Sequence, residues 1–258
     1  MNDTKSDDWF RATWPLDRGS WARLGIAFVA VVAVFVAVGE VLTNWSALGG
    51  IVDLDRRVAE DVADGRTDVG NDLAPWAAGI ADTPIKIGLS ILICGFLIWR
   101  LRRWRETAMI AMSLIFEATA FIVTTTIVGR PRPEVERLLE SPVNTSFPSG
   151  HVAAAAVYSA IAVVVFWNTR AVWARTLAVV FSVLAPIAVG WARIYQGMHY
   201  LSDVVAGVVL GVVSVVIVAK VLGPPTPEET SRDERGGHHG DADDVATGHV
   251  RTREAEVA

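Results

Sequence analysis

The chain has 258 residues, of which 52% are hydrophobic, and its mean hydropathy is +0.39. The apolar residues are gathered in long blocks, whereas a soluble core would spread them through amphipathic periods, so composition excludes an ordinary soluble domain. A formal net charge of −5, with no basic stripe away from these blocks, argues against a nucleic-acid partner. The single cysteine, Cys94, excludes an intrachain disulfide and a thiolate metal cluster.

Six stretches are long and apolar enough to be transmembrane helices. We place them near Leu24–Leu42, Ile85–Trp99, Ala108–Val128, Val152–Trp167, Leu177–Trp191 and Leu201–Leu222. The first stretch is long and follows a polar segment, which indicates an anchor helix and not a cleaved signal.

The predicted fold is therefore all-α, a polytopic membrane protein with a bundle of six transmembrane helices. Residues 20–222 form the membrane domain, between a polar tail at 1–19 and a disordered acidic tail at 223–258. The three histidines of the second tail are isolated, and we do not expect them to bind a metal: His238, His239 and His249.

Basic residues predict the orientation of the chain in the membrane. They gather in the N-terminal tail, between the second and third stretches, and between the fourth and fifth. By the positive-inside rule these segments face the cytoplasm. We therefore expect a multi-pass plasma-membrane protein with both termini in the cytoplasm. The connections 43–83, 129–150 and 192–200 then lie on the extracytoplasmic side.

The first of these connections shows an internal pattern. Ile51, Leu54, Val58 and Val62 recur at helical spacing, with charged residues between them. This pattern predicts a helix that lies either in the membrane interface or as a packed lid over the bundle.

Three polar clusters lie in the predicted outer segments, far apart in sequence but on one membrane side and at one depth. They are Gly129-Arg130-Pro131-Arg132-Pro133 after the third helix, Pro148-Ser149-Gly150-His151 before the fourth, and Arg193, His199 and Asp203 before the sixth.

A phosphate ester fits the chemistry of these clusters. It needs cations and N–H donors around its oxygens, a nucleophile in line with the leaving oxygen, and an acid to protonate that oxygen. Arg132 and Arg193 can each hold phosphate oxygens in a bidentate fork. Ser149 and Gly150 precede a helix, so their N–H groups offer an anion site.

The remaining side chains supply a nucleophile and an acid. His199 and Asp203 are four residues apart on one helix face. Asp203 can then accept the proton of one imidazole nitrogen and leave the other free to attack phosphorus. His151 is left as the acid. Each residue also has a structural alternative as an ordinary membrane-interface side chain, but three clusters at one depth favour catalysis.

The clusters resemble the signature motifs of the type-2 phosphatidic-acid phosphatase superfamily, which includes vanadium haloperoxidases and bacterial undecaprenyl-diphosphate phosphatases. That pattern reads Lys, six residues, Arg-Pro; then Pro-Ser-Gly-His; then Ser-Arg, five residues, His, three residues, Asp. Residues 132–133 close the first motif, residues 148–151 are the whole second, and residues 193–203 keep the spacing of the third.

The resemblance, which covers about residues 20–222, implies a lipid phosphatase that needs no metal or other cofactor. Its substrate would be a lipid phosphate or diphosphate on the outer membrane face. His199 would form a phosphohistidine, Asp203 would orient it, and His151 would be the general acid. The phosphate-binding residues would be Arg132, Arg193, Ser149 and Gly150.

Two positions depart from this pattern. Ala192 replaces the serine of the third motif, and Thr125 stands where the first motif has lysine. Arg130 is our hypothesis for the phosphate-binding cation that compensates for Thr125; the alternative is a site short of one cation. A phosphotransferase with the same nucleophile, or a non-catalytic protein that binds lipid phosphate, are the other functions that the sequence leaves open.

Glu117 lies near the middle of the third predicted helix, about 16 Å below Val128 at helical rise. A carboxylate inside the membrane is a functional candidate by default. At that depth it is too far to touch the phosphate, so we expect it to form a hydrogen bond to a neighbouring helix.

Overall fold

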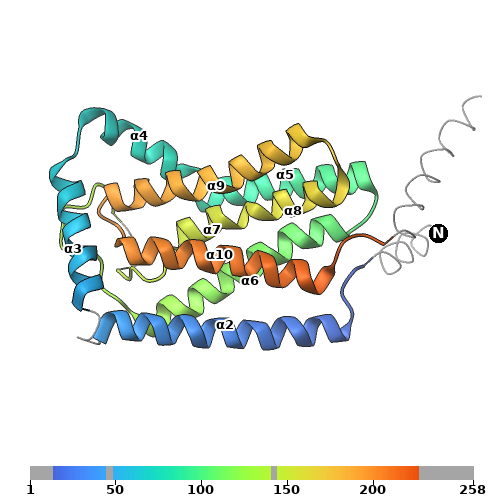
Figure 1. The fold of residues 1–258 in the computed structure, drawn as a ribbon, viewed down its shortest axis with the longest axis horizontal. Coiled ribbons are helices and arrows are strands. Elements are labelled where there is room, and N and C mark those ends of the chain that lie inside the picture. Colours follow the sequence, from blue (N-terminus) through green and yellow to red (C-terminus); the bar gives the residue numbers. More distant parts are fainter. Residues whose placement is uncertain (1–13, 45–48, 141–143, 227–258) are drawn as a thin grey trace, which may run out of the picture.

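The computed structural model describes residues 14–44, 49–140 and 144–226, so most of both predicted tails, with the three tail histidines, lies outside the described residues. Within these ranges every regular element is a helix, which confirms the all-α prediction. The helices are α2 (Arg18–Asn44), α3 (Gly49–Asp64), α4 (Asp68–Gly79), α5 (Thr83–Leu101), α6 (Arg105–Val128), α7 (Gly150–Val157), α8 (Ser159–Asn168), α9 (Val172–Tyr195) and α10 (Leu201–Leu222) (Figure 1).

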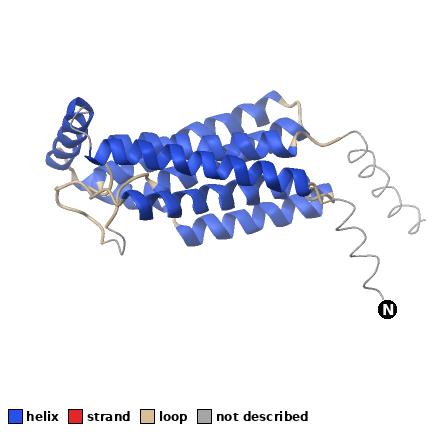
Figure 2. Cartoon of the chain, turned by 90° about the horizontal axis from the view of Figure 1, so that it is seen from below, coloured by secondary structure: helices blue, strands red, loops and turns tan. Residues whose placement is uncertain are grey.

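Six helical segments are long and apolar enough to cross a membrane, and they match the six predicted stretches. Five are single helices; the remaining one consists of α7 and α8 in succession, spanning Gly150–Asn168. The shortest segments have 19 residues, or about 28 Å at 1.5 Å per residue, which matches a hydrocarbon core of about 30 Å. Figure 2 shows these helices side by side, with the connecting loops gathered at the two ends of the bundle.

The contact between α7 and α10 brings two of the motifs together. Two glycines of α10 face α7: a Cβ at Gly207 would lie 2.6 Å from the carbonyl oxygen of Ser149, and a Cβ at Gly211 would lie 2.4 Å from that of Ala153. On α7 the facing residues are small as well, a run of buried alanines at 153–156. Small residues on both sides let the backbones approach closely, so the start of α7 lies against the start of α10.

Two helices outside the bundle, α3 and α4 (residues 49–79, called the cap here), cover the end where α2 finishes and α10 begins (Figure 1). The predicted helix at 51–62 is α3. It buries Asp55 and Ala59, so the packed lid is the alternative that the structure supports. The sequence did not predict α4, which buries Ala74 and Ala78 in a cluster with Tyr195 at the end of α9.

Candidate active site

The first two motifs are joined by the segments that precede α7 and follow α6. The Ser146 N–H donates to the carbonyl oxygen of Arg130 at 2.8 Å, and the Ser146 hydroxyl donates to that of Pro131 at 2.9 Å. Pro131 and Thr145 also form an isolated antiparallel bridge. The Arg-Pro segment is therefore fixed beside the entry to α7 by main-chain contacts.

The third motif joins this pair in the same way. The Ser149 N–H donates to the carbonyl oxygen of Asp203 at 3.0 Å. The Arg132 guanidinium donates from Nη1 to the carbonyl oxygen of Met198 at 2.7 Å. Three motifs that are separated in sequence thus meet at the cap end of the bundle.

The hydrogen bonds of His199 fix its tautomer. Its Nδ1 lies 2.7 Å from the carbonyl oxygen of Ser146 and 3.9 Å from the nearer carboxylate oxygen of Asp203. Since a carbonyl only accepts, Nδ1 carries the proton and Nε2 keeps its lone pair. The predicted hydrogen bond from His199 to Asp203 is absent, because 3.9 Å is too long for one and Nδ1 donates to Ser146. The Asp203 oxygens accept from Arg130 at 2.6 Å and from the Tyr200 N–H at 2.9 Å.

The surroundings of His199 keep the ring neutral. Burial holds the pKa of this imidazole well below its ordinary value, and the charges of Arg193 and Arg132 lower the pKa further. A neutral imidazole with a free Nε2 is the form that a nucleophile requires.

Three buried donors within the second and third motif segments lack a protein acceptor. In the described part of the chain, no hydrogen-bond partner is found for Ser149 Oγ, Arg193 Nε or Gln196 Nε2. Buried polar atoms in proteins are nearly always hydrogen-bonded, and a set of donors without an acceptor suits an anion. Gln196, whose Oε1 accepts from Arg193 Nη1 at 3.1 Å, was not predicted, although its spacing from Arg193 places it on the same helix face.

The predicted phosphate contacts at the start of α7 need one correction. The N–H of Ser149 is occupied by the Asp203 carbonyl, so its hydroxyl, and not its N–H, is available to an anion. Gly150 is the first residue of α7, where N–H groups have no carbonyl one turn earlier in the helix. A Cβ at Gly150 would lie 2.7 Å from the ring of Phe121, so glycine also allows the packing of α7 on α6.

His151 lies at the edge of the site and has a carboxylate partner that the sequence did not reveal. Its Nε2 is 3.1 Å from Oδ1 of Asp82, the N-cap residue of α5. The side chain of His151 is 33% exposed, compared with 5% for that of His199. His151 is thus accessible from outside, while His199 lies in the interior.

Arg130 has a different environment from the other two arginines. Its guanidinium donates to Asp203 at 2.6 Å, to Asp55 of α3 at 2.9 Å and to the Ser202 hydroxyl at 2.8 Å, and it stacks on the Tyr200 ring. Burial alone would lower the pKa of Arg130, but the two carboxylates outweigh it and raise this pKa. The Arg130 guanidinium is therefore occupied by Asp55 and Asp203, and phosphate binding by Arg130 stays a prediction.

Two buried residues of α6, Thr125 and Glu117, were also singled out in the sequence. Thr125 is buried, and its hydroxyl lies 2.9 Å from that of Thr145, so a neutral pair of hydroxyls fills the position of the motif lysine. Glu117 is buried too, but among the described residues its Oε2 has no hydrogen-bond partner. The interhelical hydrogen bond expected of Glu117 is absent at that atom.

The segment from α6 to the end of α10 is similar to a known protein family. Residues 106–225 match the family model described as the PAP2 superfamily, and this range contains all three motifs. These residues belong to the PAP2 superfamily. The predicted resemblance is confirmed for the segment from α6 to the end of α10.

Two solved structures are similar to this fold. One is the first transmembrane PAP2 type phosphatidylglycerolphosphate phosphatase from Bacillus subtilis, with a TM-score of 0.63 and 20% identity over 76% of this chain and 92% of that one. The other is Aquifex aeolicus LpxE, with a TM-score of 0.51 and 23% identity over 65% and 95% of the two chains. At these identities the comparison shows a shared fold, that of a membrane protein.

A curated relative matches over a shorter range. The bacitracin transport permease protein BcrC of Bacillus licheniformis is 37% identical over 87 residues, 33% of this chain. The match spans 38% of the length of that relative.

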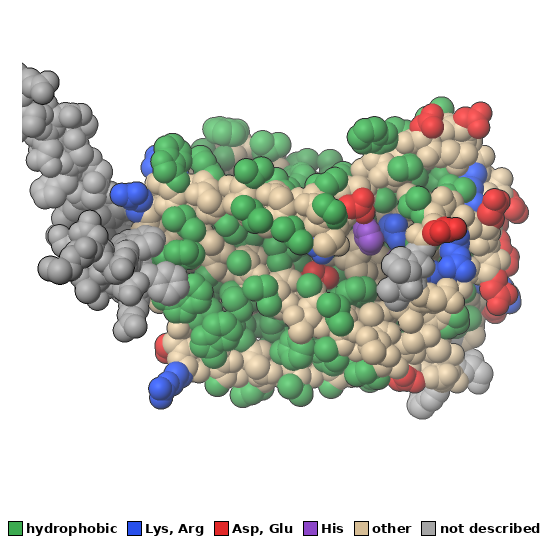
Figure 3. All heavy atoms as spheres, turned by 180° about the vertical axis from the view of Figure 1, so that it is seen from behind, with side chains coloured by type: hydrophobic (Ala, Val, Ile, Leu, Met, Phe, Trp, Pro, Cys, Tyr) green, Lys and Arg blue, Asp and Glu red, His purple; other side chains and the backbone are tan. Residues whose placement is uncertain are grey.

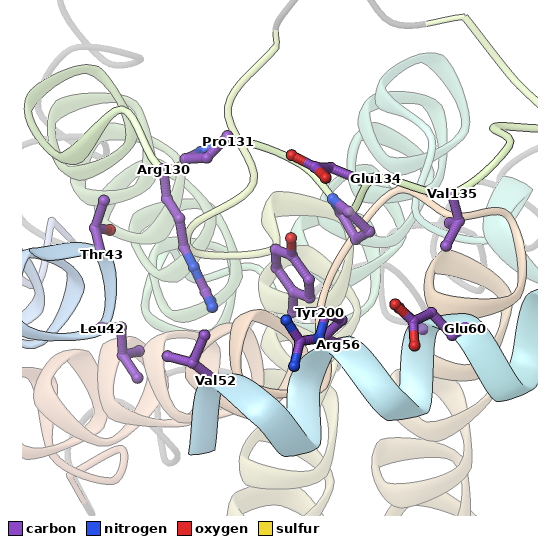
Figure 4. A pocket seen from close by; sticks show the side chains of 12 residues that line it. Leu42, Thr43, Val52, Arg56, Glu60, Arg130, Pro131, Glu134, Val135 and Tyr200 are labelled. Atoms are coloured by element: carbon purple, nitrogen blue, oxygen red, sulfur yellow. The ribbon is translucent and has the colours of Figure 1, made fainter. Parts of the chain in front are cut away.

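Both carboxylates that were missed, Asp55 and Asp82, come from outside the PAP2 segment, on α3 and before α5. A hollow of about 350 Å³ also lies between α3 and the segment after α6 (Figure 4). Arg56, Arg130 and Tyr200 line it, but neither His151 nor His199 does. Arg130 thus lines this hollow and also donates to Asp203 of the third motif.

Proposed function

We propose that the protein is a phosphatase that hydrolyses a lipid phosphate or diphosphate through a phosphohistidine at His199. One observation carries the proposal: the second and third motif segments, which a main-chain hydrogen bond joins, hold the unpartnered buried donors of Ser149, Arg193 and Gln196. The same segments hold a neutral imidazole whose Nε2 is free. Membership of the PAP2 superfamily, and a structural neighbour described as a phosphatidylglycerolphosphate phosphatase, support it.

The first step is transfer of phosphate to the enzyme. Nε2 of His199 attacks phosphorus, the bond from phosphorus to the leaving oxygen breaks, and its electron pair goes to that oxygen. His151 gives the oxygen a proton. Arg132 and Arg193 offset the charge on the phosphoryl oxygens during this step.

The second step returns the enzyme to its starting state. Water attacks phosphorus, the phosphorus–nitrogen bond breaks, and its electron pair returns to Nε2 of His199. His151, which is now neutral, takes the proton of the water and inorganic phosphate leaves.

Two carboxylates act on these histidines without touching the substrate. Asp203 lies 3.9 Å from Nδ1 of His199, so its charge stabilises the positive imidazole that forms during attack, while the Ser146 carbonyl holds the ring. Asp82 accepts from Nε2 of protonated His151, which leaves Nδ1 of His151 to donate to the leaving oxygen.

The decisive experiment measures phosphate release by the purified protein from a polyprenyl diphosphate, phosphatidic acid and phosphatidylglycerol phosphate, with and without excess chelator. We expect release from at least one lipid and no loss on chelation, because Arg132 and Arg193 supply the positive charge that a metal would provide.

Other outcomes of this assay favour other functions. Activity that chelation abolishes and magnesium restores would contradict the metal-independent mechanism. A phosphorylated acceptor in place of free phosphate would indicate a phosphotransferase, and lipid binding without turnover would indicate a non-catalytic protein.

We further propose that the cap and the catalytic site face the extracytoplasmic side. The basis is the positive-inside rule, applied to the end of the bundle opposite the cap, where α2 begins and α10 ends (Figure 1). The basic residues in the connections at that end, or in the helix ends beside them, are Arg100, Arg102, Arg103, Arg105, Arg170 and Arg175.

Cysteine labelling in intact cells tests this orientation, in a variant that carries Cys94→Ala. A membrane-impermeant reagent is expected to label Glu140→Cys in intact cells and Arg170→Cys only after permeabilisation, since both positions are exposed at opposite ends of the bundle. Labelling of position 170 from outside would reverse the orientation.

A further inference from the structure

A lysine on α5 lies one helical turn below the partner of His151. Lys86 follows Asp82 by four residues, and its N–H donates to the Asp82 carbonyl at 2.8 Å, so the two side chains share one face of the helix. Side chains on a helix lean toward its N-terminus. The Lys86 ammonium therefore leans toward Asp82 and His151, at the end of the bundle that holds the site.

This ammonium has no direct partner in the described part of the chain. Lys86 is half-buried within the candidate span Thr83–Leu101, and no hydrogen bond or ion pair of its side chain is found among the described residues. It is nevertheless close enough to His151 and Glu117 for its charge to act on both. A cation at such a position is costly unless an anion pairs with it.

The position of Lys86 relative to the two histidines indicates which part of a substrate it would meet. His199 attacks phosphorus from one side, and His151 protonates the oxygen that leaves from the other side. Asp82 and Lys86 lie on the His151 side, so the group attached to the leaving oxygen passes them. In a lipid monophosphate that group is carbon, whereas in a lipid diphosphate it is a second phosphate.

We propose that Lys86 binds the lipid-side phosphate of a diphosphate lipid, so that the enzyme prefers diphosphates to monophosphates of the same lipid. This inference rests on the proposed function. In a diphosphate lipid the bond between the terminal phosphorus and the bridging oxygen breaks. The leaving group is then the lipid monophosphate, which keeps the bridging oxygen and the electron pair of the bond. Lys86 offsets the charge that develops there, and His151 supplies the proton.

The surface beside Lys86 is open to the membrane. α5 buries none of its residues and packs mainly on α6. Figure 3 shows a histidine side chain with acidic and basic side chains at the surface of the bundle, between areas covered by apolar side chains. A lipid chain that lies along α5 therefore remains in the bilayer while its phosphates reach the histidines.

The test compares a polyprenyl diphosphate with the monophosphate of the same chain, on the full-length protein in lipid nanodiscs. We expect Lys86→Gln to lower the ratio of kcat/KM values, diphosphate over monophosphate, about tenfold or more, as for loss of one charge-assisted contact. Lys86→Arg should keep most of the preference, because it keeps the charge. Lys220→Gln, an exposed lysine in the last turn of α10, is the matched control and should leave the ratio unchanged.

Each other outcome has a distinct meaning. A ratio that Lys86→Gln leaves unchanged, whether both activities fall equally or neither falls, overturns the role of Lys86. Equal losses on both substrates in Lys86→Gln and Glu117→Gln would assign the lysine to a structural pair with Glu117. A wild-type protein that is inactive on both substrates would instead refute the proposed function.

Discussion

His199→Ala is expected to abolish phosphate release, with a loss of turnover of at least about a thousandfold. The proposed reaction passes through a bond between phosphorus and Nε2 of His199, and removal of a covalent nucleophile has effects of this size or larger. Among the described residues the other histidine is His151, which in the proposed reaction lies on the side of the leaving oxygen and so does not replace the nucleophile. Steady-state release of phosphate from the preferred lipid measures the effect.

His151→Ala is the informative control for this variant. It should be severely impaired on the lipid but still form phosphoenzyme from an aryl phosphate, whose leaving group needs no proton. Both proteins should melt close to the wild type, which would show that each defect is chemical. Near-normal turnover in His199→Ala would eliminate the mechanism.

Arg130→Ala should be nearly as damaging, but through loss of structure. Removing one partner from a buried ion pair costs about 3–5 kcal/mol, and here the loss leaves two buried carboxylates, Asp55 and Asp203, without their cation. We expect a clear fall in melting temperature and a loss of activity of about a hundredfold or more. Thermal unfolding in detergent and phosphate release measure the two effects.

Arg132→Ala separates this effect from loss of a phosphate contact. It should weaken competitive inhibition by inorganic phosphate, whereas the residual activity of Arg130→Ala should be inhibited by phosphate as in the wild type. Weaker phosphate inhibition in Arg130→Ala, with an unchanged melting temperature, would support the hypothesis that Arg130 contacts phosphate.

Sequence patterns were sufficient for the features that arise from local chemistry. The transmembrane helices follow from apolar blocks, and α3 follows from the spacing of residues 51–62. The motifs meet because alternate connections of a membrane bundle share one end. By contrast, α4 carries Pro75 inside the helix, a residue that normally ends a helix, and it was missed.

Partners in three dimensions were beyond a single sequence. Asp55 and Asp82 belong to no motif and lie 75 and 69 residues away from Arg130 and His151. The acceptor for His199 is the main-chain carbonyl of Ser146, a group that every residue carries. For the same reason Arg130 suggested a phosphate ligand: only the placement of Asp55 identifies it as the centre of an ion-pair network.

The ion pair between Asp55 and Arg130 has a consequence for protein engineering. It joins the cap to the arginine that also pairs with Asp203 of the bundle, so the cap and the membrane bundle are not interchangeable modules. A chimaera that receives its cap from another protein has to bring a carboxylate to position 55, because Arg130 otherwise loses one of its two anionic partners. Grafts that ignore this requirement would remove the contact that ties the cap to Arg130, however well their hydrophobic surfaces match.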